Sequence, residues 1–123
     1  MGDHLRYRIT DRLIEVHLEG DYSAARLIEV IDDALAHATS ERMFMLIDAR
    51  QSTANRPSSE VRVIAGELSR RAPKIERLAI VTGSEDHYGL SRMGAARAED
   101  SGLVAHPFRT LQEALDFLRI AGP

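Results

Sequence analysis

The segment FMLIDARQSTANRPSSEVRVIAGEL, residues 44–68, is the part of the sequence that best indicates the fold class. Residues 43–47 are apolar at every position, which is typical of a central strand covered on both faces, and Asp48 is expected to mark the end of that strand. After a polar loop, apolar residues recur with the spacing of one buried helical face, and they are Val61, Ile64, Ala65, Leu68 and Ala72. Pro73 is expected to end this helix. A buried strand followed by an amphipathic helix is the repeating unit of a parallel α/β sheet.

The residues before this segment predict a hairpin and a helix. Apolar and polar residues alternate in 5–9 and again in 14–18, with a short break between them, which indicates two antiparallel strands. Ser23 can then cap a helix that is expected to run to about His37.

The residues after the segment predict two more strand and helix pairs. Residues 78–81 are a second buried strand, Ser84 can cap the following helix, and Gly102 can close it. The apolar side of this helix is thin, so it either forms a loose lid over a pocket or packs tightly through its small residues. Those apolar and small residues are Leu90, Met93, Gly94, Ala95 and Ala96.

The C-terminal residues complete the predicted order. Residues 103–105 are expected to be a short last strand, and Thr110 with Glu113 forms a capping box for a helix that ends near Gly122. The whole chain, 1–123, is therefore interpreted as one α/β domain of order ββαβαβαβα. Its five-stranded sheet should be mostly parallel, with an antiparallel strand at the N-terminus.

Composition narrows the classes of function. The chain has 123 residues, a net charge of −3, no cysteine and 5% aromatic residues, so nucleic acid is not an expected partner and thiolate chemistry is excluded. No apolar run approaches the roughly 18 residues of a membrane span. The start MGDHLRYR lacks the apolar core of a secretion signal, so a cytoplasmic protein is expected. The five histidines are dispersed, so neither a metal nor another cofactor is expected.

Several stretches resemble the SpoIIAA-like group of the STAS domain family: RLIEVHLEGDYSAARLIEVIDDAL, FMLIDAR, RLAIVTG and HPFRTLQEALDFL. The resemblance spans nearly the whole chain. It implies a βα superhelix, a fold shared with the lipid-binding part of CRAL-TRIO (SEC14-type) proteins. It also implies a non-catalytic module of bacterial signalling, in which phosphorylation of a serine at the start of the second major helix acts as a switch. The equivalent serines here are Ser58 and Ser59, although the Asp and Gly that flank the family's motif are absent.

Three interpretations of the polar loop remain open. Pro57, Ser58 and Ser59 can simply begin the helix, with serine satisfying a free backbone N–H. A phosphate or another anion on Ser58 or Ser59 could instead be held by Arg56 and by Arg62 at the helix N-terminus. The third possibility is a ligand site at the carboxyl ends of the strands, whose rim would comprise Asp48, Arg50, Ser52, Thr53, Ser84 and His87. The same groups include the residue types of a hydrolase triad, but no Gly-x-Ser-x-Gly elbow presents a serine, so an enzyme is not expected.

The buried strands lead to two hypotheses about function. Sequential right-handed crossovers would place every helix on one face of the sheet, yet residues 43–47 and 78–81 are apolar on both faces. The second face must therefore be covered by the last helix, a loop, a second subunit or a lipid-like ligand. The first hypothesis is a STAS-like interaction module with a protein partner and a possible homodimer. The alternative is a carrier or sensor of a hydrophobic small molecule.

Overall fold

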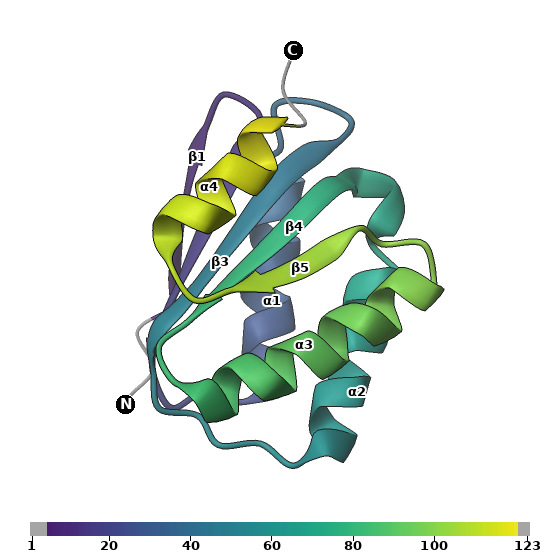
Figure 1. Ribbon diagram of the computed structural model, residues 1–123. Coiled ribbons are helices and arrows are strands. Elements are labelled where there is room, and N and C mark those ends of the chain that lie inside the picture. The colour runs from purple at the N-terminus through teal and green to yellow at the C-terminus, as the bar shows by residue number, and fades with distance from the viewer. Residues whose placement is uncertain (1–4, 121–123) are drawn as a thin grey trace.

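The computed structural model describes residues 5–120, with the side chains of 5–119, and shows a five-stranded sheet with helices on both faces (Figure 1). The order ββαβαβαβα is confirmed. The elements are β1 (Arg6–Thr10), β2 (Leu13–Gly20), α1 (Ala24–Ala36), β3 (Met43–Ser52), α2 (Ser58–Ser69), a 3-10 turn (Ala72–Lys74), β4 (Ile75–Thr82), α3 (Glu85–Asp100), β5 (Ala105–Phe108) and α4 (Leu111–Ile120). The predicted end of the last helix near Gly122 lies outside the described residues.

The sheet has the order β1-β2-β3-β4-β5, so neighbours in space are also neighbours in sequence. β1 pairs antiparallel with β2, as predicted for the hairpin, and the other three pairings are parallel. Asp11, in the hairpin turn, has a φ of 53°, a left-handed conformation that Asp tolerates because its short side chain can bond locally. The carboxyl ends of β2, β3 and β4 consequently lie at one edge of the sheet.

Several predicted strand boundaries are wrong, and β4 begins at Ile75 instead of Leu78. β3 does not end at Asp48 but continues to Ser52, because its polar second half still pairs with β2 through Glu19 and Gly20. The last strand comprises Ala105–Phe108 instead of residues 103–105, since these are the residues that pair with Leu78–Val81 of β4. A proline within this strand is tolerated because β5 is an edge strand with one side unpaired.

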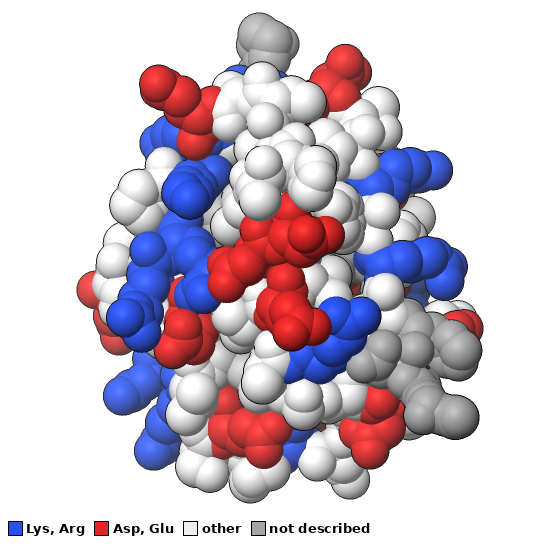
Figure 2. Space-filling model, turned by 180° about the vertical axis from the view of Figure 1, so that it is seen from behind, with Lys and Arg blue, Asp and Glu red and all other residues white. Residues whose placement is uncertain are grey.

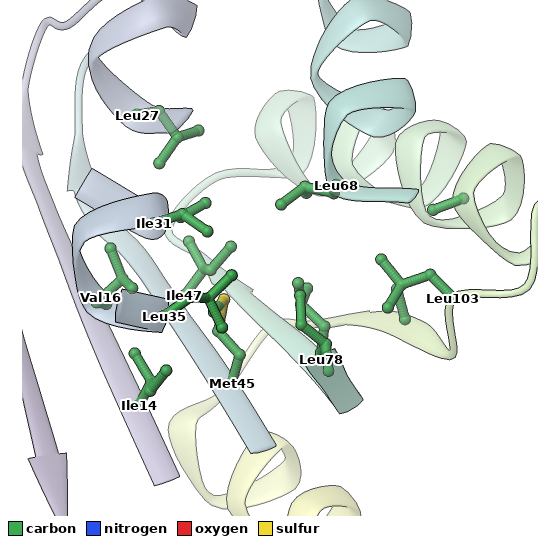
Figure 3. Close-up of a cluster of buried hydrophobic side chains, with 14 of the residues drawn as sticks. Ile14, Val16, Leu27, Ile31, Leu35, Met45, Ile47, Leu68, Leu78 and Leu103 are labelled. Atoms are coloured by element: carbon green, nitrogen blue, oxygen red, sulfur yellow. The ribbon is translucent and has the colours of Figure 1, made fainter. Parts of the chain in front are cut away.

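The larger core lies between one face of the sheet and helices α1, α2 and α3. Every second residue of β2 and β3 points into it, so that Val16, Met45 and Ile47 meet Ile31 of α1 (Figure 3). From the other side, Leu68 of α2, Leu78 of β4 and Leu103 extend toward the same space.

The smaller core lies on the second face of the sheet, between the sheet and helix α4. Helix α4 crosses the front of the sheet while α1 lies behind it (Figure 1). Phe44 and Leu46 of β3 are buried in this smaller core with Ala114 and Leu118 of α4, and Leu111, Leu115, Phe108 and Phe117 pack around them. The last helix therefore covers the apolar strands, and the reason for expecting a ligand on that face is removed.

The predicted helix starts are confirmed at three positions. Ser23 accepts a hydrogen bond from Arg26 N, Ser84 from His87 N and Thr110 from Glu113 N. Helix α2 is different, because Pro57 occupies its N-cap position and no side chain caps it. Serine capping was the wrong prediction there, since Ser58 and Ser59 already lie inside the first turn.

Candidate functional site

A cavity of about 130 Å³ lies between the sheet and helices α2 and α3, at the carboxyl end of β4. Its wall is largely apolar, with contributions from β2, β3, β4 and all three helices of that face. The apolar residues that line it include Leu18, Leu27, Ile47, Ile64, Leu68, Leu78, Ile80, Leu90 and Leu103.

The cavity exists because α3 cannot fill the space beneath it. The buried residues of α3 are Ala95 and Ala98, whose side chains are single methyl groups. Gly94 lets α3 approach α2 closely, because a Cβ at this position would lie 3.1 Å from Val61 Cγ1. The two helices thus pack tightly against each other while the volume between them and the sheet is left open, as expected for a helix with few large apolar side chains.

Thr82 also belongs to the wall of this cavity, although its hydroxyl oxygen has less than 1 Å² of accessible surface. It is the last residue of β4 and lies on the same face as Leu78 and Ile80, since alternate residues of a strand share a face. The residue is 4% exposed, and within residues 5–120 its hydroxyl has no hydrogen-bond partner. Buried polar atoms in proteins are nearly always paired, because leaving one unpaired costs about 1–3 kcal/mol.

Three polar residues beside the cavity, Tyr22, Ser52 and Arg56, are held by hydrogen bonds within the protein. Ser52 donates a hydrogen bond to Tyr22 Oη (3.0 Å) and accepts one from Ala54 N (3.3 Å). Arg56 donates to the carbonyl of Tyr22 (2.7 Å), forms an ion pair with Glu60, and lies 4.7 Å above the Tyr22 ring. This network fixes the loop that joins β3 to α2 beside the cavity.

The structure separates the predicted rim residues into three groups. Ser52 and His87 line the cavity. Thr53 and Ser84 are exposed near it, where Thr53 N bonds Gly20 O and Ser84 caps α3. Asp48 and Arg50 lie on the opposite face, because they alternate with Ile47 and Ala49, which face the cavity.

Asp48 and Arg50 form an ion pair at the edge of the α4 face. Arg50 Nε and Nη2 donate to the two oxygens of Asp48 at 2.9 and 2.8 Å, and His17 Nδ1 lies 3.5 Å from Asp48. Burial by itself would raise the pKa of Asp48, but the hydrogen bonds from Arg50 outweigh it and hold that pKa below its ordinary value. The same bonds raise the pKa of Arg50. The pair stabilises the strand and takes no part in the cavity.

The predicted phosphate site lies outside the cavity. Ser58 and Ser59 are exposed in the first turn of α2. Arg56, which was expected to hold an anion there, is already occupied by Glu60 and by the carbonyl of Tyr22. Arg62 is exposed on the same helix.

Sequence reasoning missed Tyr22, Thr82 and Ser91, which also line the cavity. For Thr82 a signal was present, because it continues the alternation of Leu78 and Ile80 and should face the same core. Tyr22 and Ser91 gave none, since their positions depend on how a loop and a helix pack over the sheet.

The face of the molecule opposite to α4 carries charges of both signs. Figure 2 shows acidic side chains at its centre with basic side chains beside them. The exposed acids of α1 are Glu29, Asp32 and Asp33. Arg71, which follows α2, donates hydrogen bonds to the carboxylate of Asp32.

In residues 5–120 no three His, Asp or Glu side chains are grouped in a way that could hold a metal ion. Within the same residues, no helix has the length and apolar character needed to cross a membrane.

Comparison with solved structures defines the class of fold. A protein of the DUF3478 family from Shewanella loihica, described as uncharacterised and as having a SpoIIAA-like fold, superimposes with a TM-score of 0.62. The match covers 95% of this chain and 94% of that one, at 15% sequence identity. The chain therefore has a SpoIIAA-like, STAS-type fold, as the sequence resemblance implied. No protein-family model and no curated protein matches the chain.

Proposed function

We propose that this protein is a non-catalytic binding protein for a small hydrophobic molecule, which occupies the cavity under α2 and α3. The observation that carries the proposal is a cavity of about 130 Å³ whose wall is apolar except for a few polar side chains, among them Ser52, Tyr22 and His87. Small-molecule sites in proteins have this character, with an apolar lining and few polar groups that fix orientation.

The position of the cavity in the fold supports a binding role. In open α/β sheets, ligands bind beyond the carboxyl ends of the strands, where loops meet the sheet. The cavity includes Ser52 and Thr82, the last residues of β3 and β4. Part of the cavity therefore lies at the edge of the sheet where such binding groups are found.

The arrangement of side chains supports the absence of catalysis. His87 lines the cavity, whereas Asp48 faces α4 on the other side of the sheet and is paired with Arg50. A serine, His87 and Asp48 consequently cannot form a hydrogen-bonded triad.

The proposal can be tested by combining native mass spectrometry with a variant that fills the cavity. Freshly purified protein is expected to carry a mass that is lost on denaturation, or, if purified empty, to bind added toluene. In ¹H–¹⁵N spectra the toluene should shift amides of α3 and β4. Ala95→Leu places three more carbons in the cavity and should abolish both effects. The proposal fails if no mass is carried and toluene at its solubility limit moves none of these amides.

A second candidate function is an interaction module of bacterial signalling with a protein partner. The fold is that of the STAS type, and Ser58 and Ser59 are exposed at the N-terminus of α2, where free backbone N–H groups favour a phosphate. Phosphopeptide mapping of protein isolated from its native cells tests the switch. An absence of phosphate on both serines under every growth condition would contradict it. Sedimentation velocity tests the proposed homodimer.

A further inference from the structure

We infer that the free edge of β1 binds an extended peptide segment in which acidic and apolar residues alternate, and that this segment adds a strand to the sheet. The site shares no residue with the cavity, so the inference does not depend on the proposed ligand. It follows from three features of this edge: its unpaired backbone, its two arginines and the groove beside it.

The backbone of β1 presents free hydrogen-bonding groups. β1 is an edge strand, and within the described residues it pairs with β2 alone. A two-residue turn joins Thr10 to Leu13, the pair that closes the hairpin. Because the closing pair of such a hairpin is hydrogen-bonded and bonded pairs alternate from there, the peptide groups of Tyr7 and Ile9 face away from β2. An added strand bonds to groups of this kind.

The opposite edge of the sheet is less suited to a partner. β5 has four residues, and one of them, Pro107, has no N–H to donate. β1 has five residues and no proline. A partner strand therefore finds more backbone to bond at β1.

The exposed side chains of the β1 edge are basic. Arg6 and Arg8 are exposed and lie on one face of the strand, since alternate residues share a face. Arg8 bonds Glu15 of β2 (2.8 Å), whereas Arg6 has no ion-pair partner within residues 5–120. Carboxylates at the facing positions of an added strand would pair with Arg6 and share Arg8 with Glu15.

The same arginines disfavour a second copy of this chain as the added strand. When β1 pairs antiparallel with its copy, the register centred on Arg8 places this residue opposite itself. The register centred on Tyr7 places Arg6 opposite Arg8. Like charges directly opposite each other destabilise a pair of strands. The edge is therefore suited to an acidic partner and not to self-association.

A groove beside β1 accommodates the remaining side chains of the added strand. Its walls come from β1 and α1 and include Tyr7 of the strand and Val30 of the helix. The acids in these walls are already engaged within the protein. Asp33 accepts a hydrogen bond from Tyr7 Oη (2.9 Å), and Glu29 is paired with Arg26. Side chains that alternate with the carboxylates enter this groove, so apolar residues such as valine suit those positions.

The test is a titration of ¹⁵N-labelled protein with the acetylated and amidated peptide EVEVEVE, followed through amide shifts. One matched peptide has lysine in place of each glutamate, and another has the same composition grouped as EEEVVVE. The protein variant is Arg6→Glu. Its control is Arg92→Glu, which makes the same change of charge at an exposed position of α3.

The alternating acidic peptide is expected to shift the amides of Tyr7, Ile9 and Val30. Its affinity should fall about tenfold in Arg6→Glu, because an attraction between opposite charges is replaced by a repulsion, and should be unchanged in Arg92→Glu. The lysine and grouped peptides should also bind about tenfold more weakly or worse.

N-methylation of the peptide tests the backbone pairing, because only one alternate set of its N–H groups faces β1. Methylating the valines should abolish binding if the added strand is antiparallel, and methylating the glutamates should do so if it is parallel.

Other results would overturn the inference. Unshifted β1 amides, or a peptide that binds equally well with either set methylated, would show that no strand is added. Equal affinity for the acidic and lysine peptides would contradict the assigned charge. A dimer in sedimentation velocity that the peptide dissociates would assign the edge to a second copy. None of these results changes toluene binding in the cavity, so this inference and the proposed function fail separately.

Discussion

The two faces of the sheet are covered in different ways. On one face α4 brings Leu118 and Phe117 against Phe44 and Leu46, and large side chains fill the layer. On the other, α3 brings Ala95 and Ala98, and a cavity is left above Leu78. A helix with large apolar residues completes a core, whereas one with small residues leaves volume that a ligand can occupy.

The largest expected effect comes from shortening a leucine on each face. Leu118→Ala removes a buried side chain from the filled layer, so the free energy of unfolding should fall by about 3 kcal/mol. Leu90→Ala removes a half-buried leucine that borders the cavity and should cost about 1 kcal/mol. Urea denaturation measures both. Equal losses would show that the two faces are packed alike.

Enlarging an alanine on each face should have opposite results. Ala114→Leu forces extra carbons into the filled layer under α4 and should destabilise the protein by about 2 kcal/mol. Ala95→Leu extends into the cavity and should leave the melting temperature unchanged or higher. Differential scanning calorimetry of the ligand-free proteins makes the comparison. A similar loss for both would mean that the cavity cannot accept more atoms.

The ion pair at the edge of the α4 face should make a smaller, pH-dependent contribution. The folded-state pKa of Asp48 lies below its ordinary value of 3.8, so its stabilising effect is present above that pH and is lost as the pH falls through the lowered pKa. Asp48→Asn should cost about 1 kcal/mol at pH 7 and progressively less below pH 4. The exposed Asp100 provides the control through Asp100→Asn. A difference between Asp48→Asn and wild type that does not vary with pH would contradict this account.

The smallest expected effect compares two threonines. Thr82→Val removes an unpaired hydroxyl, so the ligand-free protein should have unchanged stability or gain up to about 1 kcal/mol. Thr110→Val removes a hydroxyl that caps α4 and should lose about 1 kcal/mol. Thermal unfolding of the two variants gives the sign of each change. A loss at Thr82 equal to that at Thr110 would show that its hydroxyl is paired.

Much of the fold could be predicted because its signals are local. Apolar alternation gave the hairpin, continuous apolar runs gave β3 and β4, and hydroxyl residues gave the starts of three helices. The strand ends were less predictable. β3 continues past Asp48, and β5 is built around a proline, because pairing with a neighbouring strand overrides the composition of the segment.

The candidate site was predicted only in part. Ser52 and His87 line the cavity, and both were expected from their positions after buried strands. Asp48 and Arg50 face the other side because β3 is five residues longer than its apolar run, which places them within the pleat of the strand instead of in a loop.

The sequence by itself determined the order of elements, the mostly parallel sheet and the need to cover both faces of its central strands, since these follow from the spacing of residues along the chain. The tertiary structure alone decided that α4 covers the second face, that Thr82 lies unpaired in the wall, and that a cavity remains under α3. The physical reason is that a cavity is the difference between the space enclosed by several elements and the side chains that fill it, so its size depends on all of them together.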